Sequence, residues 1–385
     1  MSVFGEALAR LMAARGVGVH ELGRQSNYTA GHISNLRSGT KHPSSRCAAD
    51  LDDLLGAGGE LLAAAGLDEP DESPRFGVAG QPVIPVPPVD DVHPAEHLRI
   101  FRHLISDSDN LFGPRHLIPL VREQVTTIAQ LRHGRTGTDS RDLLCMQAQY
   151  AETLAWLYQD MTLFRDAQYW LDRALEWAHM ADDRVWAAFT LARKSQLAGD
   201  MHDPASAVDL AEAAARMASD GTRVRAAGAA YRAHGHALAG DADASQRALD
   251  QAHEIAERPD DEPAAPWVPW LNTDYVEVQR ARCLATLGDH AQAADLFGRA
   301  IDGIPARLRR DRGVYIARQA VAHAGSDDLA AATAAGIRAA AIYQHTWSGR
   351  ILTELRRLDA AASRSRETSE LRGVLAAVMR QAPRR

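Results

Sequence analysis

The chain has 385 residues, of which 46% are hydrophobic and 24% are charged, and its net charge at pH 7 is −7. This length exceeds what a single hydrophobic core usually serves, so we expect two or more domains. Frequent alanines, few β-branched residues and the lack of sustained apolar–polar alternation argue against a β-rich fold and predict an all-α protein.

The cysteines and the first residues bear on the compartment of the protein. Cys47, Cys145 and Cys283 lie far apart and form no C-x-x-C pair, so no disulfide framework is indicated. Residues 1–16 are amphipathic, unlike the apolar run of a signal peptide. No stretch reaches the roughly 18 uncharged apolar residues that a membrane span needs. We therefore expect a cytoplasmic protein with reduced thiols and no membrane partner.

Basic residues gather in the first part of the chain, although the chain as a whole is acidic. Residues 1–49 contain six basic and two acidic side chains, which gives this segment a net charge of +4. No acid lies between Arg24 and Arg46, whereas the segment that follows is rich in aspartate. A positive charge confined to one segment is typical of a nucleic-acid-binding domain.

The same segment contains the pattern of two short helices joined by a turn. Leu22, Ile33 and Leu36 fall where two steeply crossed helices would bury them, and glycines at 16 and 18 end the helix before them. The helix boundaries are marked in the sequence. Asn27 tolerates the left-handed turn between the two helices, and Thr29 is the N-cap of the second. Gly39 ends the second helix, and Pro43-Ser44 begins the next one.

The pattern resembles the Cro/repressor-type (XRE) helix-turn-helix family along residues 3–66. The positions that match the family are Leu22, Ile33, Ser34, Leu36, Gly39 and Pro43-Ser44. The resemblance implies a five-helix DNA-binding domain over residues 1–66, with the second helix of the motif, residues 29–38, in the major groove of double-stranded operator DNA. Two alternatives remain: an ordinary helical hairpin, and a helix-turn-helix fold that has been repurposed for protein contacts.

The resemblance also assigns roles to residues of the motif. The base-facing positions are Thr29, Ala30, Gly31, Ser34 and Asn35. The positions suited to phosphate contacts are Arg24, Arg37, Lys41 and Arg46, and His32 either approaches the DNA backbone or is an ordinary surface residue. Val19 departs from the family, which often has a polar phosphate contact there. Because so few base contacts bind weakly, we expect a homodimer on two half-sites.

The rest of the chain comprises a linker and a long helical region. Residues 67–95 contain seven prolines and are predicted to be an extended linker, and residues 96–385 are helical in pattern. Within this region one helical quartet recurs at offsets of 39, 39 and 48 residues (Leu171/Ala174/Leu175/Ala178, Leu210/Ala213/Ala214/Met217, Leu249/Ala252/His253/Ala256 and Phe297/Ala300/Ile301/Ile304). Gly-Asp turns are predicted before the later copies, at Gly199-Asp200, Gly240-Asp241 and Gly288-Asp289.

These copies resemble a divergent tetratricopeptide (TPR) repeat over residues 145–340. The best copy has Ala155, Tyr158, Ala167, Leu171 and Ala174 at the spacing of the family, whereas Lys194 and the long period depart from it. The resemblance implies a TPR-like α-solenoid with residues 95–133 and 347–380 as caps. An irregular helical bundle with coincidental spacing is the alternative.

The concave face of such a solenoid is the predicted effector site. The resemblance places Gln149, Glu152, Trp156, Gln159, His234, Tyr275 and Arg282 on this face. A mixture of aromatic, amide and guanidinium groups suits an amphipathic peptide or small molecule. The alternative for Trp156 and the other tryptophans is ordinary core packing.

The combination of domains looks like the peptide-sensing regulators of Gram-positive bacteria, and still more like actinobacterial transcription regulators. We therefore expect a nucleoid-associated, sequence-specific transcription factor whose repeat domain dimerises and senses an effector; the alternative is a protein-interaction adaptor that retains the fold. No P-loop, dinucleotide fingerprint or nucleophile elbow occurs. The H-x-x-E-H pattern at 93–97 spans the predicted start of a helix and is set aside as a zinc site. We expect no enzyme activity, cofactor or metal.

Overall fold

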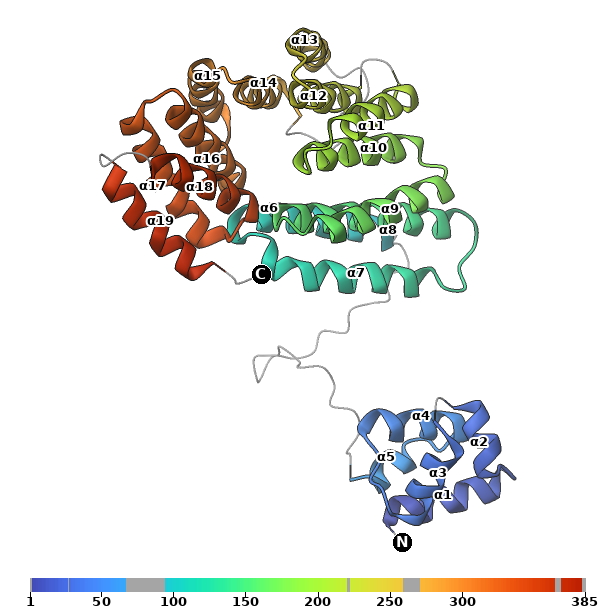
Figure 1. The fold of residues 1–385 in the computed structure, drawn as a ribbon. Helices are drawn as coiled ribbons and strands as arrows, with labels where there is room; N and C mark the ends of the chain where they lie inside the picture. The colour runs from blue at the N-terminus through green and yellow to red at the C-terminus, as the bar shows by residue number, and fades with distance from the viewer. Residues whose placement is uncertain are drawn as a thin grey trace, which may run out of the picture. The chain divides into compact units, whose positions relative to one another are not determined.

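Helices make up all the regular secondary structure in the part of the chain that the computed structural model describes, namely residues 2–26, 28–66, 94–219, 222–258, 271–363 and 368–382, without the side chains of Ser45 and Arg46. The all-α prediction is thus confirmed. The chain divides into two compact units, Met1–Val89 and Asp90–Arg385 (Figure 1). Residues 67–93, almost all of the predicted linker, lie outside the described residues.

The N-terminal unit consists of short helices around a small apolar core. Leu22, Ile33 and Leu36 are completely buried, as the sequence predicts for the contact between the two helices of the motif. Leu8 of the first helix and Leu51 of the fourth complete the centre of this core. The helices are α1 (Val3–Ala14), α2 (Val19–Gln25), α3 (Ala30–Ser38), α4 (Ser45–Leu55) and α5 (Glu60–Ala64).

The ends of these helices follow the local signals in the sequence. Thr29 caps α3, because its Oγ1 accepts a hydrogen bond from the backbone N–H of His32 at 3.2 Å. Ser44 caps α4 in the same way. Gly39 ends α3 in the left-handed conformation, with φ +81°. Asn27, predicted to make the turn, lies outside the described residues.

Two glycines bring neighbouring helices close to α3. A Cβ on Gly5 of α1 would lie 2.5 Å from the carbonyl oxygen of Arg37, at the end of α3. A Cβ on Gly23 of α2 would lie 3.1 Å from the backbone nitrogen of Ala30, at its start. Larger side chains at either position would push α3 away from its supports, so these glycines fix the orientation of the helix.

The second unit is a succession of antiparallel helix pairs. Its helices are α6 (Pro94–Phe112), η1 (Pro114–His116), α7 (Leu117–Arg132), α8 (Gly137–Asp160), α9 (Phe164–Met180), α10 (Arg184–Asp200), α11 (Pro204–Met217), α12 (Arg223–Leu238), α13 (Ala242–Glu257), α14 (Thr273–Leu287), α15 (His290–Gly303), α16 (Arg309–Gly325), α17 (Leu329–Thr346), α18 (Gly349–Ala362) and α19 (Ser369–Gln381). Each pair packs on the next, which is the stacking of a helical repeat. None of the helices in the described ranges is long and apolar enough to cross a membrane.

The repeat is real, but the predicted register of its second copy is wrong by one residue. Leu210 and Ala213 are only partly buried, whereas Ala211 and Ala214 are almost completely buried. The buried series is therefore Leu171, Ala211, Leu249 and Phe297, at offsets of 40, 38 and 48 residues. Because all residues from 211 to 215 except Glu212 are alanine, the apolar pattern alone does not distinguish the two registers.

The turn between paired helices also differs from the prediction at one site. Gly199-Asp200 lies inside α10, and the turn is made by His202 and Asp203 instead. His202 is left-handed, with φ +61°, and Asp203 accepts a hydrogen bond from the N–H of Ser206 at 3.1 Å. The same pair of a left-handed residue and a capping aspartate recurs at Gly240-Asp241, Gly288-Asp289 and Asp327-Asp328. The constant feature is the capping aspartate rather than the glycine.

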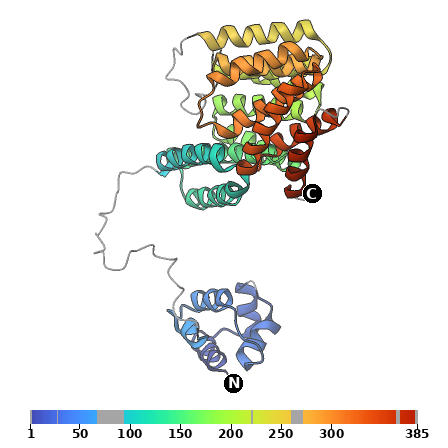
Figure 2. The ribbon, with the colours of Figure 1, turned by 90° about the vertical axis from the view of Figure 1, so that its left-hand side faces the viewer.

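The succession of pairs curves back until its last helices contact its first. α16 and α17 pack against α6, so late helices of the succession meet its first helix (Figures 1 and 2). Two glycines allow this close approach. A Cβ on Gly113 would overlap the carbonyl oxygen of Thr346, and a Cβ on Gly349 would lie 2.7 Å from the carbonyl carbon of Met161. The repeat unit is thus closed on itself.

Candidate DNA-binding surface and interior cavity

Helix α3 is held by its apolar side and leaves small polar residues outside. Ile33 and Leu36 anchor it in the core. Thr29 and Gly31 are exposed, and the other base-facing candidates, Ala30, Ser34 and Asn35, are half-buried. All of these residues lie at the start or middle of one short helix. A partner at this surface would contact backbone groups and short side chains.

His32 occupies a different position from the other candidates on α3. Its ring is half-buried and stacks on Tyr28 with ring centroids 5.5 Å apart, and its Nε2 lies 3.9 Å from Cys47 Sγ. The Tyr28 hydroxyl donates to Asp50 Oδ2 at 2.7 Å, and this hydrogen bond together with burial raises the pKa of Tyr28 to about 12. His32 therefore takes part in the contact between α3 and α4. Nothing in the sequence pattern of the motif indicates this role for Tyr28.

Comparison with known protein families addresses this unit. A family model described as a helix-turn-helix domain matches residues 3–65. Residues 3–65 form a helix-turn-helix domain. The match spans α1 to α5, with α2 and α3 as the helix pair that names the domain. A search of curated proteins finds no match for the chain.

The basic side chains of the helix-turn-helix domain differ in whether they already form hydrogen bonds or ion pairs. Arg37 and Lys41 are exposed and make no hydrogen bond or ion pair with any described residue. Arg24 is also exposed but is paired with Glu21 one turn earlier on α2. Arg46 lies in the first turn of α4, and its side chain is not described. Arg37 and Lys41 therefore offer positive charge to a partner without giving up an existing contact.

The second unit encloses a cavity of about 330 Å³, a volume within the usual range of small-molecule sites. It is lined by α6 and by the first helices of the repeats, α8, α10, α12, α14 and α16. Among the predicted effector residues, Glu152, Trp156, Tyr275 and Arg282 line it, whereas Gln149, Gln159 and His234 are buried outside its lining.

The buried residues outside the lining have structural contacts of their own. Gln159 Nε2 donates to Asp200 Oδ2 at 2.7 Å, and Gln159 Oε1 accepts from Arg193 Nη2 at 3.3 Å. His234 lies directly against Gly199, where a Cβ would come within 2.6 Å of its Nδ1. Burial, together with the nearby positive charge of Arg282, keeps the pKa of His234 well below its usual value, so the ring is neutral at pH 7.

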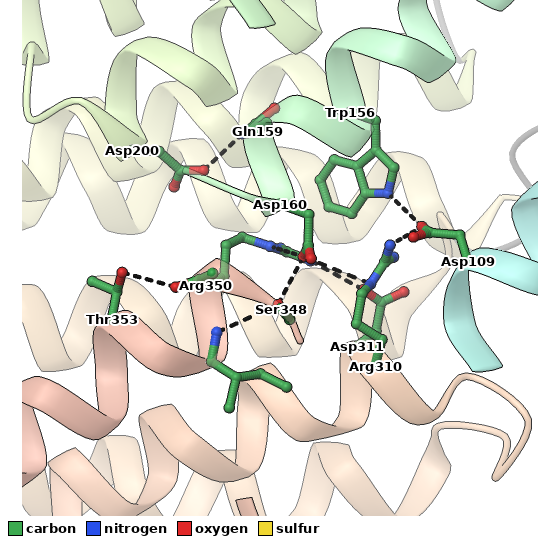
Figure 3. Close-up of polar contacts among 12 residues, drawn as sticks. Asp109, Trp156, Gln159, Asp160, Asp200, Arg310, Asp311, Ser348, Arg350 and Thr353 are labelled. Carbon is green, nitrogen blue, oxygen red and sulfur yellow. Dashed lines mark hydrogen bonds and ion pairs between the residues drawn. The ribbon is translucent and has the colours of Figure 1, made fainter. Parts of the chain in front are cut away.

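Trp156 packs against the apolar core and also belongs to a charged cluster. The guanidinium carbons of Arg193, Arg310 and Arg350 lie 4.6, 4.8 and 4.3 Å from the centre of its indole ring. Its Nε1 donates to Asp109 Oδ2 at 3.1 Å (Figure 3). Guanidinium groups are attracted to the face of an indole ring, so Trp156 holds side chains from three helices together.

The same cluster closes the repeat unit. Asp160, at the end of α8, is completely buried. It accepts hydrogen bonds from Arg350 Nε at 2.8 Å and from Ser348 Oγ at 3.0 Å, both at the start of α18 (Figure 3). Arg310 of α16 pairs with Asp109 of α6. Buried pairs of this kind are costly to break, because either partner alone would be an uncompensated charge.

Aromatic side chains form another part of the cavity wall. Trp186, Phe189, Tyr231 and Tyr275 all line it. The hydroxyls of Tyr231 and Tyr275 are hydrogen-bonded at 2.8 Å, and Gln196 Nε2 donates to Tyr275 at 3.4 Å. The cavity thus combines an aromatic surface with guanidinium, carboxylate and amide groups.

The structure gives no support to a metal site in the part of the chain that it describes. No group of His, Cys, Asp and Glu is arranged to hold a metal ion within the described ranges. Glu96 and His97 are exposed in the first turn of α6, and His93 lies outside the described residues. Cys47, Cys145 and Cys283 are free thiols.

Proposed function

We propose that the chain is a sequence-specific, DNA-binding transcription regulator of the Cro/repressor (XRE) type. The observation that carries the proposal is the helix-turn-helix domain at residues 3–65, in which α3 is exposed beside the unpaired charges of Arg37 and Lys41. In this arrangement α3 enters the major groove, where Asn35 reads an adenine and Ala30 meets a thymine methyl. Arg37, Lys41, Arg24 and Arg46 neutralise phosphates.

Selection of bound sequences from random duplex DNA by the full-length protein tests this proposal. We expect enrichment of a two-half-site sequence, and we expect Asn35→Ala to relax the preference at one position of each half-site. Gln25→Ala, on the outer part of α2, is the control and leaves the preference unchanged. Failure to enrich any sequence would favour the adaptor, which needs no operator.

We further propose that the protein dimerises through the apolar stripe on α6. Ile100, Leu104 and Leu111 lie on one side of this helix and are 56%, 57% and 46% exposed. They lie opposite the buried residues of α6, so no described part of the unit covers them. The variant Ile100→Glu/Leu104→Glu is expected to be monomeric in light scattering, whereas Met180→Glu, at an equally exposed apolar residue, stays dimeric. An unchanged mass of the α6 variant would contradict the proposal.

The repeat unit acts, in this proposal, as the sensor and not as an enzyme. The unit is TPR-like, and its cavity binds a peptide or small-molecule effector. The protein is located in the cytoplasm, at the nucleoid. The support is that Trp156 and Arg310 belong both to the cavity wall and to the contacts that close the unit. A ligand that binds the closed form better than an open form shifts the balance between them, and so changes the dimer and its spacing on DNA.

A further inference from the structure

Arg102 differs from the other buried arginines around the cavity. Arg193 pairs with Glu152, Arg282 with Asp200, and Arg350 with Asp160 and Asp311. Arg310 and Arg318 also have carboxylate partners. Arg102, which lines the cavity and is only 5% exposed, makes no hydrogen bond or ion pair with any described residue.

Arg102 has no ion-pair partner of its own, although the carboxylate of Glu152 lies near enough to attract its charge. Its Nε is buried and has no hydrogen-bond acceptor among the described residues, and its guanidinium lies 5.5 Å from the centre of the Trp186 ring. The carboxylate of Glu152 is already hydrogen-bonded to Arg193 Nε at 2.8 Å. An arginine side chain does not lose its proton in proteins, so the buried guanidinium keeps a charge and unused donors to which an anion can bind.

The cavity also contains hydrogen-bond acceptors that lack donors. The side-chain oxygens of Asn110, Gln196 and Gln279 are buried in its wall and have no donor within the described ranges. Asn110 follows Arg102 by eight residues on α6, which is a rise of about 12 Å along the helix. Trp186 and Phe189 provide an aromatic surface beside Arg102. These groups are complementary to a ligand that has an anionic group at one end, an aromatic or apolar body, and hydrogen-bond donors farther along.

We propose that the cavity binds a carboxylate ligand with an aromatic or apolar body, and that Arg102 receives the carboxylate. The carboxylate belongs either to a small aromatic acid or to the C-terminus of a short apolar peptide, since both present the same group. Binding does not depend on the proposed function; only the effect of the ligand on operator affinity rests on it.

The ligand-free protein provides the first test, through the melting temperature of two matched variants. Arg102→Met removes a charge without a partner, so its melting temperature is expected to equal or exceed that of the wild type. Arg193→Met leaves Glu152 unpaired in the interior and is expected to melt lower. A loss of stability in Arg102→Met as large as that in Arg193→Met would overturn the proposal, because Arg102 would then be a structural residue.

Binding of paired acids and amides provides the second test. The probes are indole-3-acetate against indole-3-acetamide, and a Leu-Trp-Ala-Phe peptide with a free against an amidated C-terminus, measured by calorimetry. We expect one acid to bind about tenfold more tightly than its amide, and this preference to disappear in Arg102→Met. The pair that shows the preference identifies the source. Equal behaviour of acid and amide in both pairs, or a preference that survives in Arg102→Met, would overturn the proposal.

Operator binding measured on the same samples separates the two proposals. A protein that prefers the acid but binds no DNA contradicts the proposed function and leaves the carboxylate site standing. A protein that binds its operator but shows no acid preference contradicts the carboxylate site alone.

Discussion

The helix-turn-helix domain keeps its unpaired charges at the surface. The repeat unit also has charged side chains in its interior, and nearly all of the described interior charges are paired. In the first, an apolar core supports exposed Arg37 and Lys41, which water solvates until a partner arrives. In the second, Asp160, Arg310 and Arg350 are buried where their partners hold them in one geometry. Surface charge is thus available for recognition, and buried charge fixes the closed form.

The largest expected effect comes from breaking a buried pair in the repeat unit. Arg350→Met leaves Asp160 without its main partner and should lower the free energy of unfolding by about 3–5 kcal/mol. The tryptophans all lie at or beyond residue 156, so their fluorescence in denaturant reports on this unit alone.

Lys194→Met is the matched control, because Lys194 pairs with Asp172 at the more exposed outer side. It should cost less than about 1 kcal/mol. Equal losses in the two variants would contradict the distinction between interior and surface charge.

A smaller effect sharpens the register of the repeats. Ala214→Leu adds bulk where the side chain is 1% exposed and should cost about 1–3 kcal/mol through overpacking. Ala213→Leu adds the same atoms at a half-buried position and should stay within about 0.5 kcal/mol of the wild type. A larger loss at position 213 would restore the register that the sequence pattern suggested.

The smallest effect is expected from acid. Burial by itself raises the pKa of Asp200, but Arg282, Arg318 and the hydrogen bond from Gln159 outweigh it and hold this pKa well below its usual range. The unfolded carboxyl titrates near pH 4, so this stabilisation is present above about pH 4 and is lost as the pH falls toward the lower folded pKa. In Asp200→Asn the melting temperature should fall less between about pH 5 and about pH 3 than in the wild type. Parallel profiles would show that other carboxyls dominate.

Local features of the helix-turn-helix domain could be predicted from the sequence, whereas distant contacts in the repeat unit could not. Thr29, Gly39 and Ser44 act within three or four residues, so their roles are visible in the sequence alone. The bond from Ser348 to Asp160 joins residues 188 positions apart and depends on the curvature of every intervening pair.

The interior site shows the same limit. The family pattern places Trp156 and Arg282 toward the ligand, but it gives no reason to choose Arg102. The lack of an ion-pair partner for Arg102 is a property of the packed unit, because the carboxylate of Glu152 is near Arg102 in space but bound to Arg193. Glycines at 113 and 349 are signs of the closure, yet each resembles an ordinary turn glycine until its neighbour is known.

The most direct test of the central claim is the salt dependence of DNA binding by the full-length protein. If Arg37 and Lys41 contact phosphates, the double variant Arg37→Gln/Lys41→Gln should bind more weakly, and the slope of log K against log[salt] should become shallower by about 2. Arg10→Gln, which removes a charge already paired with Glu60, should leave the slope unchanged. DNA binding that is absent, or that has the same salt slope in all three proteins, would contradict the account.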